Sequence, residues 1–342
     1  MRASLLSALV VVAHSCVSDF DCSLNGVCDL SESVCKCDSP WSGSSCETMT
    51  FSVTPASAKN LWTGSEDANT WNGPIVFSPQ DETYHLFDPV YEHASLWKVL
   101  YYAHGVSASV EGPYDWSRFP NISSTAINPA ALVFPNASSG EPAYALFIGA
   151  DILVSNNAAG PYVKAYANPQ PSNTAPAFFN GAFYVTDQGT TSLLTATSLA
   201  GPWTTFCSIS RPSLPYTVED PFLYFDKRGN IHIINHAYNT GQTTNCTSSH
   251  VSSHFFAAAD GKQWGHSDQP YGHTVTFDDG TQHSYCTLER PNLFFDAAGE
   301  LTHIHFAADL VTGDEGCASR GKGCVDCKYD DHAGTLLVKL GN

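Results

Sequence analysis

The stretch Thr217-Val218-Glu219-Asp220-Pro221-Phe222-Leu223-Tyr224-Phe225 carries the pattern that decides the fold. A Glu stands two places before a Pro, and a run of apolar residues that favour β-strands follows at once. The pattern returns in Thr287-Leu288-Glu289-Arg290-Pro291-Asn292-Leu293-Phe294-Phe295. Weaker copies, with a polar or small pair before the proline, stand at Pro74, Pro129 and Pro176. Five copies of one strand start indicate a repeat architecture.

A second signal keeps step with the first. Gly112-Pro113-Tyr114, Gly160-Pro161-Tyr162 and Gly201-Pro202-Trp203 follow the first three copies, and a degenerate form ends at Trp264. Gly-Pro favours a tight turn that an aromatic ring can fill. From about Thr48 onward, short β-prone runs alternate with turn residues, and no helical period is sustained.

These marks predict an all-β fold in which residues 48–342 form a five-bladed β-propeller. Each inner strand would begin at its proline, where the missing N–H is tolerated. The run 334–338 would complete a blade with 51–53 and close the ring. A pair of β-sandwiches is the alternative fold, but it leaves the double repeat unexplained.

The N-terminus reads as an export signal. Residues 1–15 combine Arg2, a short apolar run at 5–12 and a small-residue cleavage site at 13–15. The apolar run is shorter than the roughly 20 residues of a membrane span, and 336–342 lack a hydrophobic anchor tail. We therefore expect a secreted, extracellular protein. Asn121, Asn136 and Asn245 begin N-x-Ser/Thr sequons and are candidate glycan sites in an exported chain.

Residues 16–47 form a separate, cysteine-rich segment. Its six cysteines, in so short a stretch with few core-forming residues, predict a small disulfide-stapled module; they are Cys16, Cys22, Cys28, Cys35, Cys37 and Cys46. The closing motif Cys35-x-Cys37-x8-Cys46, with Gly43 before the last cysteine, resembles an epidermal-growth-factor-like (EGF-like) module. That resemblance implies the pairs Cys16–Cys28, Cys22–Cys35 and Cys37–Cys46. A zinc cluster is the alternative. We expect no calcium, because no acidic residue would precede Cys16.

Six further cysteines stand in the predicted propeller: Cys207, Cys246, Cys286, Cys317, Cys324 and Cys327. In an oxidising compartment, three disulfides of unknown pairing are the preferred interpretation. Cys317, Cys324 and Cys327 with His332 are a less favoured metal-binding alternative.

Charge narrows the range of partners. The net charge is −18, with only 15 Lys plus Arg, and no cationic cluster is present. Nucleic acids and anionic membranes are therefore not expected as partners. An uncharged or weakly charged substrate is the natural expectation, with protein or matrix contact through the EGF-like module as a further one.

In a propeller, the starts of the inner strands meet at one mouth of the central channel. The acids Glu219, Asp220 and Glu289 would face one another there, on the fourth and fifth blades. Paired carboxylates on separate rigid strands suit glycosidic bond cleavage, one as acid and one as base or nucleophile. Expected substrate contacts, by position or chemistry, are Arg290, Asn128, His104, His236 and Asn72. For any single carboxylate, a role in a turn or cap is the alternative.

The domain resembles the five-bladed propeller glycoside hydrolases, the arabinanase, levansucrase and invertase superfamily, and most closely family 43-like members. The resemblance rests on Glu219-Asp220-Pro221, on Glu289-Arg290-Pro291 and on the Gly-Pro-aromatic turns. It implies that Asp220 orients and tunes, and that Glu289 is the acid. Relatives also place an Asp in the first blade, where this sequence has Gly73; Asp88 or Glu92 would be a substitute.

The sequence thus predicts a secreted glycoside hydrolase acting on a cell-wall or extracellular polysaccharide, without cofactor or metal. The alternative function is a non-catalytic carbohydrate-binding or adhesive propeller. Gly73 favours the alternative function, whereas the acidic pairs favour the enzyme.

Overall fold

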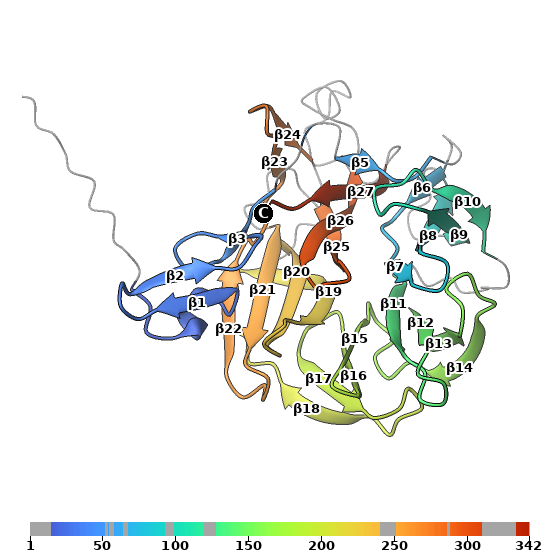
Figure 1. The fold of residues 1–342 in the computed structure, drawn as a ribbon, viewed down its shortest axis with the longest axis horizontal. Coiled ribbons are helices and arrows are strands. Elements are labelled where there is room, and N and C mark those ends of the chain that lie inside the picture. Colours follow the sequence, from blue (N-terminus) through green and yellow to red (C-terminus); the bar gives the residue numbers. More distant parts are fainter. Residues whose placement is uncertain are drawn as a thin grey trace, which may run out of the picture.

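A computed structural model describes residues 15–51, 54, 58–63, 68–92, 99–119, 128–239, 251–285, 288–309 and 333–341. Within them the chain forms five antiparallel sheets, which Figure 1 shows arranged around a common centre, with small two-stranded sheets beside them. In this described part of the chain, the regular elements are strands apart from one 3₁₀ turn, η1 (Asp19–Cys22). The all-β five-bladed propeller expected from the repeat is confirmed.

The blades follow one another along the chain. Blade 1 holds β6 (Ala68–Thr70), β7 (Ile75–Ser78), β8 (Thr83–Glu92), β9 (Val99–Ser107) and β10 (Asp115–Arg118). Blade 2 holds β11 (Ala130–Pro135), β12 (Pro142–Ile148), β13 (Asp151–Ser155) and β14 (Val163–Ala167). Blade 3 holds β15 (Ala175–Phe179), β16 (Ala182–Thr186), β17 (Ser192–Ala196) and β18 (Thr204–Ser208). Blade 4 holds β19 (Tyr216–Phe225), β20 (Ile231–Asn239), β21 (Ser252–Ala257) and β22 (Trp264–Asp268).

Blade 5 closes the ring with strands from both ends of the chain. It holds β25 (Leu288–Phe295), β26 (Leu301–Asp309), β27 (Ala333–Lys339) and, outermost, the N-terminal β5 (Lys59–Asn60). A bridge between Phe51 and Leu340 adds to this closure. The expected pairing of the last run with the N-terminal region therefore occurs, but the strand partner is β5, and Ser52 and Val53 lie outside the described residues. A short hairpin, β23 (Thr274–Thr276) and β24 (Gln282–Ser284), stands between blades 4 and 5.

The prolines mark the inner strands, though not always their first residue. In blades 4 and 5 the strand begins earlier, and Pro221 and Pro291 lie inside it where the register slips. Such a bulge leaves residues without a ladder partner, so a missing N–H costs little there. The Gly-Pro turns join the third and fourth strands of blades 1 to 3, where Gly112, Gly160 and Gly201 all have a positive φ that suits glycine.

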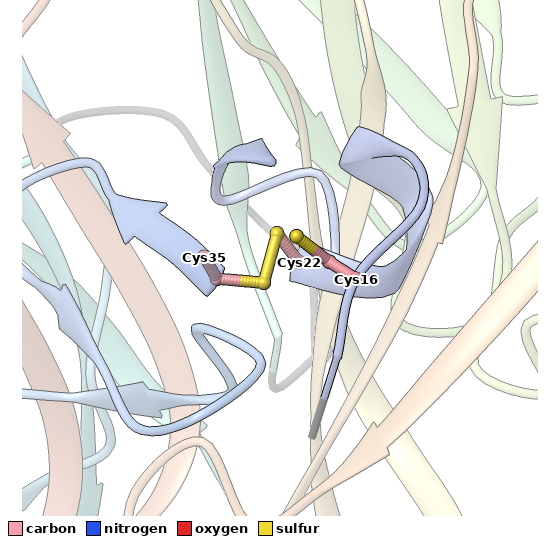
Figure 2. Close-up of side chains that lie close together, drawn as sticks. All are labelled: Cys16, Cys22 and Cys35. Carbon is pink, nitrogen blue, oxygen red and sulfur yellow. A yellow bond between two sulfur atoms is a disulfide. The ribbon is translucent and has the colours of Figure 1, made fainter. Parts of the chain in front are cut away.

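The N-terminal module contains β1 (Gly26–Asp29), β2 (Val34–Cys37), β3 (Trp41–Ser42) and β4 (Thr48–Met49). Its disulfides are those implied by the EGF-like resemblance: Cys16–Cys28, Cys22–Cys35 and Cys37–Cys46. Figure 2 shows the Cys22–Cys35 bond with the sulfur of Cys16 beside it. Because these sulfurs are oxidised in pairs, the alternative of a thiolate zinc cluster fails.

The module packs on blade 4, beside β21 and β22 in Figure 1. Trp41 stacks on His254 with a centroid distance of 5.2 Å, and Phe20 contacts Phe256 at the same distance. Arg228, in the β19–β20 turn, donates to the carboxylate of Asp38. Half-cystines of the module share one buried cluster with the interior of blades 4 and 5. The module is therefore part of the packed fold.

Of the six cysteines in the propeller, the structure describes only Cys207. Cys207 is a half-buried free thiol, so the expected disulfide at this residue is not formed. Cys246, Cys286, Cys317, Cys324, Cys327 and His332 lie outside the described residues, as do residues 1–14 of the expected signal and the sequon residues Asn121 and Asn245. Within the described part of the chain, no helix is long and apolar enough to cross a membrane.

Candidate active site

Five side chains, one from each blade, converge where the inner strands begin. They are Asn72, Asn128, Asn173, Asp220 and Arg290, and we call them the inner ring. All but Asn128 have a φ between 45° and 51°. This left-handed backbone is uncommon for residues other than glycine, and strain of this kind gathers at functional sites. Blade 3 contributes Asn173, which precedes the Pro176 strand start.

Asp220 is the hub of the inner ring. Its Oδ1 accepts hydrogen bonds from Asn173 Nδ2 at 2.6 Å and from Asn128 Nδ2 at 3.1 Å. Arg290 Nη2 donates to the carbonyl of Pro129 at 3.0 Å. Asn128 and Arg290 therefore lie at the centre as predicted, but in this structure they link blades across the ring: Asn128 joins blade 2 to blade 4, and Arg290 joins blade 5 to blade 2.

The two glutamates lie one residue before the inner ring. Glu219 Oε1 is 3.5 Å from His236 Nδ1, and Glu289 Oε1 is 4.0 Å from His236 Nε2. His236 reaches this place from β20, directly opposite Glu219 in the strand register. Each of Glu219, Asp220, Glu289 and His236 offers one atom within 4.8 Å of the others. The structure thus brings together all three predicted acids and one predicted histidine.

The pKa values of the groups in this cluster shift in different directions. Burial would raise the pKa of Glu219, but the hydrogen bond and charge of His236, with help from Gln188, lower it below its usual value. Burial raises the pKa of Asp220 to about 6, against the attraction of Arg290. Burial would lower the pKa of His236, but Glu289 and Glu219 outweigh it and raise that pKa. Glu219 is therefore ionised near neutral pH, and the neighbouring glutamates favour the protonated form of His236.

The same four groups could also hold a cation. Three carboxylates and one imidazole are a set of hard oxygen and nitrogen donors, of the kind that divalent cations bind. A cation there would compete with the proton on His236, because both neutralise the same carboxylates.

Among the residues that the structure describes, blade 1 supplies no carboxylate to the cluster, and at Gly73 the reason is steric. A Cβ on Gly73 would lie 1.7 Å from the carbonyl oxygen of Phe87, so no side chain fits. The space is used by Asp88, whose Oδ1 accepts the Gly73 N–H at 2.9 Å and whose Oδ2 accepts the hydroxyl of Thr335. Asp88 is fully buried, and its pKa rises to about 6 because of that burial. It ties the interrupted strand β6–β7 to the sheet and does not face the cluster.

Two predicted contacts are used elsewhere. His104 lies in the core of blade 1, with its ring stacked on Phe87 and hydrogen-bonded to His85 at 2.9 Å, so it cannot contact a ligand at the cluster. Asn72 is fully buried and donates to the backbone carbonyls of Arg290 and His305. Its role is to join blades 1 and 5. The side chain of Glu92 lies outside the described residues.

Sequence reasoning missed two residues of the site. Gln188 Nε2 donates to Glu219 Oε2 at 2.9 Å from the loop after β16. Asn173 holds Asp220 from blade 3. Asn173 stands three places before its proline, where the other blades have their ring residue one or two places before it. Each of the first three prolines has an Asn one to three places before it, and this pattern could have identified Asn173.

A cavity of about 900 Å³ lies on the other side of the inner ring from His236. The inner strands line it beyond their prolines, and Leu24, Asp38 and Trp41 of the module reach its far end. Glu219, Glu289 and His236 are not among its lining residues. Asp220 thus borders both this channel and the acidic cluster, whereas the two glutamates and His236 lie outside the channel.

Fold and site together define a five-bladed propeller with an acidic centre built on its last two blades. No protein-family model matches the chain, and no curated protein matches its sequence. Among solved structures, an alpha-L-arabinofuranosidase from Fusarium graminearum, in complex with an iminosugar inhibitor, is similar with a TM-score of 0.52 and 8% identity, over 83% of this chain and 97% of that one.

Two further solved structures are similar in outline. A protein of unknown function from Dyadobacter fermentans gives a TM-score of 0.49 at 8% identity, over 84% of this chain and 100% of its own. An endo-arabinase from Bacteroides thetaiotaomicron gives 0.48 at 11%, over 86% and 98%. At such identities, the similarity to the arabinofuranosidase establishes the fold and leaves the chemistry to the site itself.

Proposed function

We propose that this protein is a secreted glycoside hydrolase that cleaves a cell-wall or extracellular polysaccharide by carboxylate acid/base chemistry. The observation that carries the proposal is the meeting of Glu219, Asp220 and Glu289, from two neighbouring blades, within 4.8 Å of one another. Catalytic carboxylate pairs in glycosidases lie roughly 5–10 Å apart. The resemblance of the Pro-led motifs and the arabinofuranosidase-like fold support the same class.

The charge distribution suggests a role for each acid. Glu219 is ionised and its side chain is 23% exposed, so it is the base or nucleophile. Glu289 lies across His236 from it and would donate a proton to the leaving oxygen. Asp220, held by Asn128 and Asn173, would orient the sugar and tune the other two. Positive charge on His236 would stabilise the ionised Glu219 beside it.

Carboxylate oxygens within 4.8 Å of one another suit the closer, retaining arrangement and the two-step reaction that goes with it. An inverting site keeps its carboxyl groups roughly 6.5–9.5 Å apart so that a water fits between them, whereas a retaining site needs only about 5–5.5 Å. In the first step, Glu219 would attack the anomeric carbon as the leaving oxygen takes the proton of Glu289. In the second step, Glu289 would deprotonate the water that releases the sugar from Glu219.

Export is the second part of the proposal. Three disulfides in the module fit an oxidising compartment, and the apolar run at 5–12 after Arg2 fits a signal. The net charge of −18 disfavours anionic partners such as nucleic acid and favours a neutral polysaccharide. Contact with a matrix protein through the module is a further element of this proposal.

The test is a screen of the purified full-length protein on neutral polysaccharides, including arabinans and galactans, with reducing-sugar release as the readout. Glu219→Gln is expected to lower release by at least about a hundredfold, as loss of a catalytic carboxylate does. Glu300→Gln is the matched control, because Glu300 is an exposed carboxylate in the β25–β26 turn. NMR of the first product gives the anomeric configuration. Equal loss in both variants, or full activity in Glu219→Gln, argues against the assignment.

A further inference from the structure

A groove of about 860 Å³ lies between blades 2 and 3, on the face where the inner strands end. It is within the size range of ligand sites, about 300–1,000 Å³. None of the described residues that line it is charged or a histidine. Because the chain has a net charge of −18, a groove without charged lining residues stands out, and it suits a neutral occupant.

The groove has an aromatic floor and an amide rim. Phe183 packs against Phe134 and Phe178, with ring centroids 5.1 Å and 4.9 Å apart. On the side formed by β14, Val163 is 59% exposed and Tyr166 is 37% exposed. A pyranose ring has a C–H face that packs on aromatic rings and a hydroxyl edge that pairs with amides. The groove presents both kinds of partner.

One acceptor for sugar stands at the edge of this groove. Asn136 begins the sequon Asn136-Ala137-Ser138 in the turn after β11, and it lines the groove. Its Oδ1 accepts the Ser138 N–H at 2.9 Å, and its Nδ2 donates to Asn156 Oδ1, also on the rim, at 3.0 Å. Ala137 and Ser138 are exposed, so the sequon is accessible.

We propose that Asn136 carries an N-linked glycan and that the first sugars of this glycan lie in the groove, over Val163 and Tyr166. In the transfer, Asn136 Nδ2 forms a bond to C1 of an oligosaccharide activated as a lipid diphosphate. The C1–O bond to the diphosphate breaks, and Nδ2 loses one proton. The N–H that remains can still donate to Asn156. The glycan covers apolar surface that is otherwise open to water.

The glycan would leave the acidic cluster open. Asn136 follows the end of β11, whereas Asn128 of the inner ring precedes its start. Six residues of strand span about 20 Å, so the two lie on opposite faces of the propeller. The inference therefore depends on export of the chain and not on its catalytic activity.

The experiment uses the full-length chain secreted from a eukaryotic cell line. Glycopeptide mass spectrometry reports occupancy at Asn136, and hydroxyl-radical footprinting reports the accessibility of Tyr166. We expect Asn136 to be occupied and Tyr166 to react severalfold faster in Ser138→Ala, which removes the sequon but keeps Asn136. Asn136→Gln removes the same glycan by a different change and should give the same increase. Ser123→Ala removes the Asn121 sequon and should leave Tyr166 unchanged.

Three results would overturn the inference. The first is an unmodified Asn136 in a chain whose Asn121 or Asn245 carries glycan. The second is an occupied Asn136 with Tyr166 equally reactive in wild type and Ser138→Ala. The third is protection of Tyr166 in the glycosylated wild type only after a free oligosaccharide is added, which would make the groove a site for an external sugar.

Discussion

Asp88→Asn separates a structural carboxylate from a catalytic one. Burial raises the pKa of Asp88 from its ordinary 3.8 to about 6, so the folded protein prefers the protonated form. A shift of about two units corresponds to about 3 kcal/mol. Because the pKa of Asp88 is higher in the folded than in the unfolded protein, protonated Asp88 contributes this stabilisation in full below pH 3.8. The stabilisation is lost as the pH rises through about 6. At pH 8 Asp88 is ionised while buried, and the wild type is less stable by the full amount.

Asparagine mimics the protonated acid. Its Oδ1 can still accept the Gly73 N–H, and its Nδ2 can donate to Thr335 Oγ1. We therefore expect Asp88→Asn to match the wild type near pH 4 and to be more stable by about 3 kcal/mol at pH 8, with hydrolysis unchanged. Urea unfolding followed by tryptophan fluorescence at both pH values measures the difference in the free energy of unfolding.

Asp226→Asn is the control of opposite sign. Although Asp226 is partly buried, the nearby His232 and the hydrogen bonds that Asn230 donates lower its pKa, so its stabilisation is present at neutral pH and is lost on acidification. Its replacement should destabilise the protein at pH 8. If Asp88→Asn were less stable than wild type at pH 8, or lost turnover, Asp88 would be an ionised and functional carboxylate, and the account of blade 1 would be refuted.

Three further predictions concern the centre and the module. Gly73→Ala should destabilise the fold by about 3 kcal/mol or more, because its Cβ meets the Phe87 carbonyl; Gly272→Ala, whose Cβ meets nothing within 4 Å, should be neutral in the same denaturation assay. His236→Gln should move the acid limb of the pH–rate profile to higher pH, since the pKa of Glu219 rises without the imidazolium; an unmoved limb would remove His236 from this role. Trp41→Ala should cost about 3–5 kcal/mol in a single unfolding transition, because Trp41 is buried against blade 4; a separate transition for the module would contradict joint packing.

The repeat was sufficient to predict the architecture. Pro-led strand starts and Gly-Pro turns are local signals that depend on backbone geometry, and they recur in every blade or nearly so. The disulfide pairs of the module followed from its resemblance to EGF-like modules. The acids of blades 4 and 5 converge because both stand at the same phase of that repeat.

The repeat pattern does not predict the side-chain contacts at the centre of the propeller. Whether Gly73 leaves room for a side chain depends on how closely β7 approaches Phe87, which is a long-range packing distance. His104 and His236 stand in similar apolar runs, yet one pairs with His85 and the other with two glutamates. In β19 and β25, a bulge shifts the strand register just after Glu219 and Glu289. The sequence pattern does not reveal this shift.

The most direct test of the central claim compares turnover and sugar binding in Glu289→Gln. On a polysaccharide that the wild type cleaves, we expect the variant to bind within about twofold of wild-type affinity and to lose at least about a hundredfold in rate, because a proton donor is removed while the shape of the site is kept. Glu300→Gln should retain both properties. Undiminished turnover in Glu289→Gln would contradict the catalytic assignment, and so would a wild type that binds sugars but cleaves none of them.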